Sequence, residues 1–253
     1  MSKMPRTARI RSASRIYHVM LRGINKQQIF YDHEDYEYFM NVLQRVGQKT
    51  EMQIYAYCLM GNHVHLLIRE GTEPLEISFR RIGAAFVYYY NLKYNRVGHL
   101  FQDRFKSEPV ESDAYYLTVL RYILQNPVKA GLCEHPEDYV YSSAREYLSG
   151  CDGITETGFP ESFIGKPDLQ AFLRETNEDT CLEMPEDTNR HVTDTEACRL
   201  IRAEFGTMQP SPGNAKDRAA FNLSVQRLLR AGISIRQLGR LTGLSKKIIE
   251  NSK

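Results

Sequence analysis

The sequence contains no tryptophan, no closely spaced pair of cysteines and no long apolar run. Its five cysteines are an odd number without C-x-x-C spacing, which argues against a disulfide framework and a zinc knuckle and favours a reducing compartment. No apolar stretch approaches the length of a membrane span, and the basic N-terminus is not followed by the apolar core of a signal peptide. We therefore expect a cytoplasmic protein with no membrane partner.

Charge is distributed unevenly along the 253 residues, although the net charge is only +2. Residues 1–31 contain seven Lys/Arg and no Asp or Glu, residues 151–199 contain twelve acidic and four basic side chains, and residues 200–253 contain ten basic and three acidic ones. Two basic regions that flank an acidic one suggest two surfaces for a polyanion. Ordinary solvated faces would give the same pattern, because a basic patch is only an electrostatic footprint.

Hydrophobic periodicity predicts alternating strands and helices in the first half of the chain. The expected strands cover 16–22, 52–59, a segment from His63 and 105–110, and the expected helices cover 32–46, 74–94 and 113–125. The last helix would be capped by Asp113 and end before Pro127. This order predicts an α+β ferredoxin-like sandwich, an antiparallel sheet with helices on one face. The extra helix is the candidate to cover the other face.

The composition predicts three parts: a domain over residues 1–148, an acidic linker with one short helix over 149–199, and a small all-α module over 200–253. The module has helix-turn-helix spacing, with a core of Leu238, Leu241, Leu244 and Ile248 and with Arg236, Arg240, Lys246 and Lys247 outside it. Duplex DNA binding is one interpretation, and a plain packed helix pair is the other.

Two histidines one residue apart, His63 and His65, stand at the start of an apolar strand. Because side chains of a strand alternate between faces, both imidazoles point to one side of the sheet. Two imidazoles are half of a metal site, and a structural histidine pair is the default interpretation of such a short motif. Phosphoryl chemistry would require added oxygen ligands.

A second feature lies on the helix predicted over residues 113–125. Leu117, Leu120 and Leu124 form its apolar stripe, whereas Tyr115, Val119, Tyr122 and Asn126 form a separate row at helical spacing. Tyr122 and Asn126 are neighbours on that row and could together present a phenol and an amide oxygen. A packed tyrosine and a turn asparagine before proline would give the same pattern.

These motifs resemble the single-tyrosine HUH transposases, and more closely the branch associated with REP sequences. The resemblance rests on the His-hydrophobe-His segment 63–65 preceded by 60–62, on Tyr17-His18-Val19 with Arg22-Gly23, on residues 99–105, and above all on residues 122–132. It extends through residues 139–143 and spans about Arg15 to Leu148. Phe101 and Tyr141 stand where family members often carry tryptophan.

The resemblance implies a site and a reaction. Tyr122 would be the nucleophile, and His63, His65 and Asn126 would bind Mg²⁺ or Mn²⁺, with Glu108 as a substitute third ligand. The enzyme would cut single-stranded DNA at hairpins or palindromic repeats, form a 5′-phosphotyrosine and rejoin strands, as a monomer or homodimer in the bacterial cytoplasm near the nucleoid. A tyrosine phenol, with a pKa near 10, is a poor nucleophile without such help.

Basic side chains would hold the DNA backbone and make binding salt-dependent. The expected contacts are Arg11, Arg15, Arg22, Lys26, Arg80, Arg81, Arg104 and Lys106, with Arg236, Lys246 and Lys247 in the C-terminal module. Two alternatives remain open from the sequence. One is a DNA- or RNA-binding regulator that keeps the fold without catalysis, and the other is a metal-dependent hydrolase that uses the histidine pair to activate water.

Overall fold

The computed structural model describes residues 10–177, 179–182, 194–211 and 215–252, which fall into two compact units, residues 1–183 and 184–253. The first unit is built on a four-stranded antiparallel sheet in the order β2-β3-β1-β4. Its strands are β1 (Ile16–Arg22), β2 (Gln53–Met60), β3 (His63–Arg69) and β4 (Lys106–Pro109). This sheet, with a helix between β1 and β2 and another between β3 and β4, confirms the predicted ferredoxin-like α+β fold.

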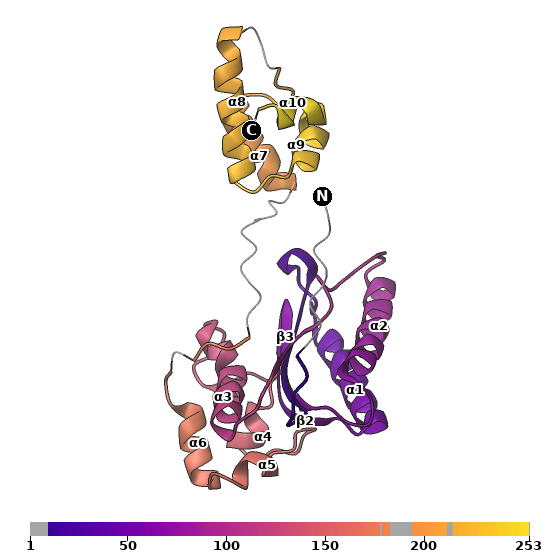
Figure 1. Ribbon diagram of the computed structural model, residues 1–253, viewed down its shortest axis with the longest axis vertical. Coiled ribbons are helices and arrows are strands. Elements are labelled where there is room, and N and C mark those ends of the chain that lie inside the picture. The colour runs from indigo at the N-terminus through magenta and orange to yellow at the C-terminus, as the bar shows by residue number, and fades with distance from the viewer. Residues whose placement is uncertain (1–9, 178, 183–193, 212–214, 253) are drawn as a thin grey trace. The chain divides into compact units, whose positions relative to one another are not determined.

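Two long helices, α1 (His33–Thr50) and α2 (Leu75–Lys93), cover one face of the sheet (Figure 1). Helix α1 begins where Asp32 and Asp35 form a reciprocal capping box. The apolar side chains of α1 and α2, such as Phe39 and Phe86, pack on the residues of β1 and β3 that point to this face, such as Val19. This core leaves the other face of the sheet for the histidines.

Helix α3 (Asp113–Lys129) packs on that second face, as predicted for the extra helix. Two details of the prediction were wrong. Ser112 caps the helix rather than Asp113, because its side chain accepts the N–H of Tyr115. The helix also continues through Pro127. A proline inside a helix removes one backbone hydrogen bond, and its ring clashes with the preceding turn. The last turn of α3 still forms, because the N–H of Ala130 donates to the carbonyl of Asn126.

Residues 149–177, expected as part of a linker, fold instead onto the first unit. They follow α4 (Ala144–Leu148) and contain α5 (Gly158–Glu161) and α6 (Lys166–Arg174). Leu169 and Leu173 are fully buried in the core beneath α3. Although the segment is acidic, its apolar side chains lie on one side and pack into this core.

The second unit is all-helical, with α7 (Asp194–Phe205), α8 (Ala215–Arg230), α9 (Ile235–Thr242) and α10 (Lys246–Glu250). Helix α7 begins inside the predicted linker. Of the predicted core residues, Leu238 and Leu244 are buried, and Leu241 and Ile248 are partly buried. Ile249, which was not predicted, is also buried. Gly243 makes the turn with φ of 77°, and Ser245 caps α10. Among the described residues no helix has the length and apolarity needed to cross a bilayer.

Candidate active site

Strand β3 presents His63 and His65 to the face covered by α3. In the sheet His63 lies opposite Arg22 of β1 and Met60 of β2, and His65 lies opposite Met20 and Cys58. The two rings are 5.1 Å apart between centroids and nearly perpendicular. The predicted arrangement of the pair on one face is therefore what the register produces.

A third imidazole, His18 of β1, completes the group. Its Nε2 atom lies 2.9 Å from Nδ1 of His65, and both side chains are almost completely buried, at 0% and 1% exposure. His18 belongs to the motif that resembles the family, but it was not predicted as a site residue. His18 lies two residues before Met20, which is opposite His65, so the register places His18 on the same face of the sheet as His65.

Hydrogen bonds occupy the same nitrogen of both predicted ligand rings. Nδ1 of His63 lies 2.6 Å from Oδ1 of Asn62, and Nδ1 of His65 is bonded to His18. An amide oxygen only accepts, so His63 carries its proton on Nδ1. Nε2 is the nitrogen left on each ring to bind a metal. Partners of this kind fix the tautomer of ligating histidines in known metal sites.

The protonation of the three rings also suits metal binding. Burial, followed by the positive charge of Arg22, lowers the pKa of His63 to about 4, although its hydrogen bond with Asn126 opposes the shift. Burial lowers the pKa of His18 to about 3, and burial together with the neighbouring imidazoles and Arg22 lowers that of His65 well below its ordinary value. All three are neutral at pH 7, the form in which imidazole binds a metal.

Helix α3 brings Tyr122 and Asn126 to the imidazoles. The Tyr122 ring meets His65 edge-on at 5.6 Å between centroids and His18 at 5.8 Å. One turn later, the side chain of Asn126 hydrogen-bonds with the ring of His63. The row of side chains predicted on this helix therefore faces the histidines, with Tyr122 5% exposed.

Lys129 is a neighbour of Tyr122 that was not predicted from the sequence. Its Nζ atom lies 5.4 Å from the centroid of the Tyr122 ring and bonds to Asn177 Oδ1 and the Asp179 carbonyl. Its spacing seven residues after Tyr122 was the available signal. Tyr122, Asn126 and Lys129 line one side of an open hollow of about 520 Å³, and Asn177, Asp179 and Thr180 line the other.

The donor set fits a divalent cation. Two neutral imidazoles and the adjacent amide of Asn126, which hydrogen-bonds with the His63 ring, are ligands that Mn²⁺ accepts, and Mg²⁺ would rely more on phosphate oxygens. Among the described residues no three His, Cys, Asp or Glu side chains converge as ligands. Glu108 therefore does not join His63 and His65 as the third ligand considered from the sequence.

The predicted DNA contacts are scattered over the first unit. Arg22 and Lys106 lie on the same face as the histidines. Arg22 is directly opposite His63, and Lys106 is opposite Met20, which is itself opposite His65. Arg80 and Arg104 line one hollow of about 240 Å³, Arg11 and Arg15 line another, and Arg81 pairs with Glu73. Lys26 is exposed in the loop that follows β1.

In the second unit Lys246 and Lys247 are exposed at the start of α10, and Lys246 lies 3.5 Å from Glu250. Arg240 is exposed on α9. Arg236 belongs to α9, and its side chain lies outside the described part of the structure. The two lysines are thus the clearest candidates for nucleic-acid contacts in this unit.

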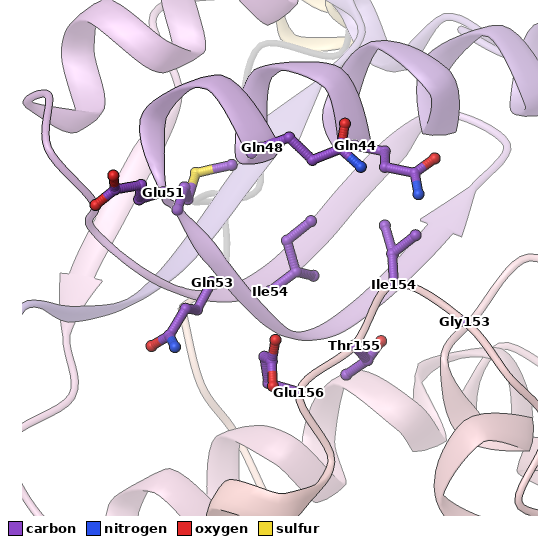
Figure 2. Close-up of a pocket in the computed structure, with 11 residues that line it drawn as sticks. Gln44, Gln48, Glu51, Gln53, Ile54, Gly153, Ile154, Thr155 and Glu156 are labelled. Atoms are coloured by element: carbon purple, nitrogen blue, oxygen red, sulfur yellow. The ribbon is translucent and has the colours of Figure 1, made fainter.

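Figure 2 shows a different hollow, about 450 Å³, between the end of α1, the start of β2 and residues 153–156. Glutamines and glutamates such as Gln44, Gln48 and Glu156 line it. None of the predicted site residues does, so this hollow is separate from the imidazole group.

Comparison with known proteins shows which family part of the chain resembles. Residues 12–126 match the model of the family described as transposase IS200 like, and they include the three histidines, Tyr122 and Asn126. The resemblance predicted from the motifs is confirmed over residues 12–126, which are similar to this family.

Two individual proteins are similar to parts of this chain. A Haemophilus influenzae protein, provisionally described as a REP-associated tyrosine transposase, is 24% identical over 143 residues, 52% of this chain and 78% of that protein. The solved structure of the REP-associated tyrosine transposase bound to a REP hairpin superposes with a TM-score of 0.53 at 16% identity, over 71% of this chain and 96% of that one. The structural likeness shows that the two proteins share a fold.

Proposed function

We propose that this protein cuts and rejoins single-stranded DNA through a covalent bond between Tyr122 and a 5′-phosphate. One observation carries the proposal: the Tyr122 ring lies 5.6 Å from His65, whose ring lies 5.1 Å from His63. A packed tyrosine would need no imidazole pair beside it. Tyr122 is 5% exposed and lines an open hollow of about 520 Å³, from which a phosphodiester would approach the phenol.

The reaction is a transesterification. The Tyr122 oxygen attacks phosphorus and forms a phosphotyrosine, the bond to the 3′-oxygen breaks, the phenol proton passes to solvent, and the leaving oxygen takes up a proton. Mg²⁺ or Mn²⁺ held by His63, His65 and Asn126 would stabilise negative charge on the phosphate oxygens. Because the phosphotyrosine keeps the diester bond energy, a DNA hydroxyl can attack it and rejoin the strands.

The substrate we propose is single-stranded DNA with a hairpin, since the solved relative is bound to one. Arg22 and Lys106, on the histidine face, would contact phosphates near the cut. The second unit would hold adjacent duplex DNA through α9 and α10. These contacts position the strand, whereas the reaction itself depends on the imidazole group and Tyr122.

The test is to incubate the protein with hairpin-bearing single-stranded DNA and Mn²⁺ and to look for an SDS-stable adduct. Tyr122→Phe should abolish the adduct and leave DNA binding nearly unchanged. The control is Tyr116→Phe, a buried tyrosine of the same helix that packs on Tyr55 and Phe159. Nicking by the Tyr122→Phe variant at the same position would refute the nucleophile. Nicking without an adduct would favour the hydrolase, and binding without nicking the regulator.

A further inference from the structure

Two buried polar atoms beside the candidate active site have no hydrogen-bond partner within the described residues. They are Nδ1 of His18 and Oε2 of Glu108. Native proteins leave few buried polar groups unpaired, so each requires an explanation. Neither atom takes part in the proposed metal ligation or in the attack on phosphorus.

The sheet register relates these two atoms. His18 of β1 and Glu108 of β4 are directly opposite each other, and both side chains point to the face that carries His65. Side chains in such a pair start about 5 Å apart at Cβ. A small rotation of the Glu108 side chain would connect the two unpaired atoms by a direct hydrogen bond. The hydroxyl of Tyr115 holds Glu108 from the helix side.

The proton positions follow from the chemistry of the groups. A carboxylate only accepts hydrogen bonds, so His18 would donate from Nδ1 and keep a lone pair on Nε2. That lone pair, 2.9 Å from Nδ1 of His65, then requires the proton of His65 to be on Nδ1. Nε2 of His65 is left with the lone pair that a metal needs.

We infer that Glu108 and His18 are positioning residues, which fix the tautomer and orientation of His65 so that its Nε2 atom faces the metal. Carboxylate–histidine–metal chains of this type raise the basicity of the ligand, and here the chain has two imidazoles in series. This assigns to Glu108 a role through His18 in place of direct ligation. The inference rests on the proposed role of His65 as a ligand.

The first test is ¹⁵N NMR of the histidine rings in the full-length, metal-free protein, which shows which nitrogen carries the proton. His65 should be protonated on Nδ1 in the wild type. Glu108→Leu and His18→Leu remove the acceptors in the chain and should shift His65 toward the Nε2–H tautomer. A wild-type His65 that already carries its proton on Nε2 would overturn the inference.

The second test is Mn²⁺ affinity, measured from the EPR signal of free Mn²⁺. Loss of an outer partner typically weakens metal binding by about 10- to 100-fold, and we expect this for Glu108→Leu and His18→Leu. His18→Gln should lose less, because its amide oxygen can accept from His65. The control is Met20→Leu, a buried neighbour directly opposite His65, which should leave both readouts unchanged. Unchanged affinity in Glu108→Leu would contradict the chain.

These outcomes are separable from those of the proposed function. Thermal unfolding identifies any variant that fails to fold, and Glu108, on the short edge strand β4, is the less disruptive of the two sites. A wild-type protein that forms no DNA adduct but shows the expected tautomer and its shift refutes the nuclease and keeps the chain. Adduct formation with no tautomer change in either leucine variant refutes the chain alone.

Discussion

The ring of Tyr122 meets the ring of His65 edge-on, with 5.6 Å between their centroids. The two residues come from different elements, α3 and β3, which pack against each other through an apolar core that contains Leu67, Leu120 and Ile123. Side-chain packing in this core therefore sets the distance between the proposed nucleophile and the proposed ligand pair.

Arg22→Gln should weaken binding of a short single-stranded oligonucleotide. Arg22 lies opposite His63 in the sheet, and its charge would neutralise one phosphate. Losing one such contact should reduce the slope of log affinity against log salt by about 0.7. Fluorescence anisotropy at several NaCl concentrations measures the slope. Arg45→Gln, an exposed position on α1 with the same charge change, should leave it unaltered, and an equal effect of both variants would argue against a local contact.

The double variant Lys246→Ala and Lys247→Ala should reduce the affinity for duplex DNA next to the hairpin and lower its salt slope by about 2. Both lysines are exposed on α10, so the variant should fold normally. Adduct formation on a short single strand should be unaffected. Duplex affinity equal to that of the wild type would show that this unit is a plain helix pair.

Asp35→Ala should destabilise the first unit by about 3 kcal/mol, because it leaves Lys93 and two tyrosine hydroxyls without their buried partner. Asp35 is fully buried and accepts bonds from Tyr94 and Lys93 at 2.7 and 3.0 Å. Urea unfolding measures the loss. Glu37→Ala, exposed on the same helix, should change stability by less than about 0.5 kcal/mol.

The same carboxylate predicts a pH dependence. Burial would raise the pKa of Asp35, but hydrogen bonds from the Tyr31 backbone, Tyr94, Lys93 and Tyr89 outweigh it and lower the pKa from its ordinary value of 3.8. The stabilisation is therefore complete above that value and is lost as the pH falls below it. Unfolding midpoints between pH 6 and 3, values chosen to bracket about 4, should fall less in Asp35→Ala than in the wild type. Parallel curves would refute this contribution.

Two glycines should respond in opposite directions to alanine. A Cβ on Gly71 would overlap the backbone of Thr50 and Glu51, which cannot move aside easily, so Gly71→Ala should cost about 1–3 kcal/mol. Gly83 lies inside α2 with open space around its Cβ position, and Gly83→Ala should stabilise by about 0.5–1 kcal/mol. Thermal unfolding of both variants checks the pair, and destabilisation by Gly83→Ala would count against the packing described for α2.

Local pattern was enough to predict the strands and the first two helices, since His63 to Arg69 and Leu75 to Lys93 carry clear periodicity and start signals. The end of α3 was predicted wrongly because Pro127 is normally a stop, and only tertiary packing of the last turn overrides it. The short helix expected within the linker is present as α6. The sequence did not show that Leu169 and Leu173 of this helix are buried in the core with α3.

The candidate site, like the fold, could be predicted from the sequence only in part. The sequence placed His63 and His65 on one face, because strand alternation needs no knowledge of neighbours. It could not pair His18 with His65 or with Glu108, since those contacts depend on the register between separate strands. A lysine at the end of a helix is common, so the sequence did not point to Lys129, whose Nζ atom lies over the ring of Tyr122 in the structure.

The sheet carries a separate apolar core on each side, one with α1 and α2 and the other with α3. Substitutions around Phe39 or Phe86 act on the face of the sheet opposite the histidines, so stability could be altered there without changing the proposed site. Conversely, the proposed DNA cleavage could be altered by changing the α3 side while the α1 and α2 side stays unchanged.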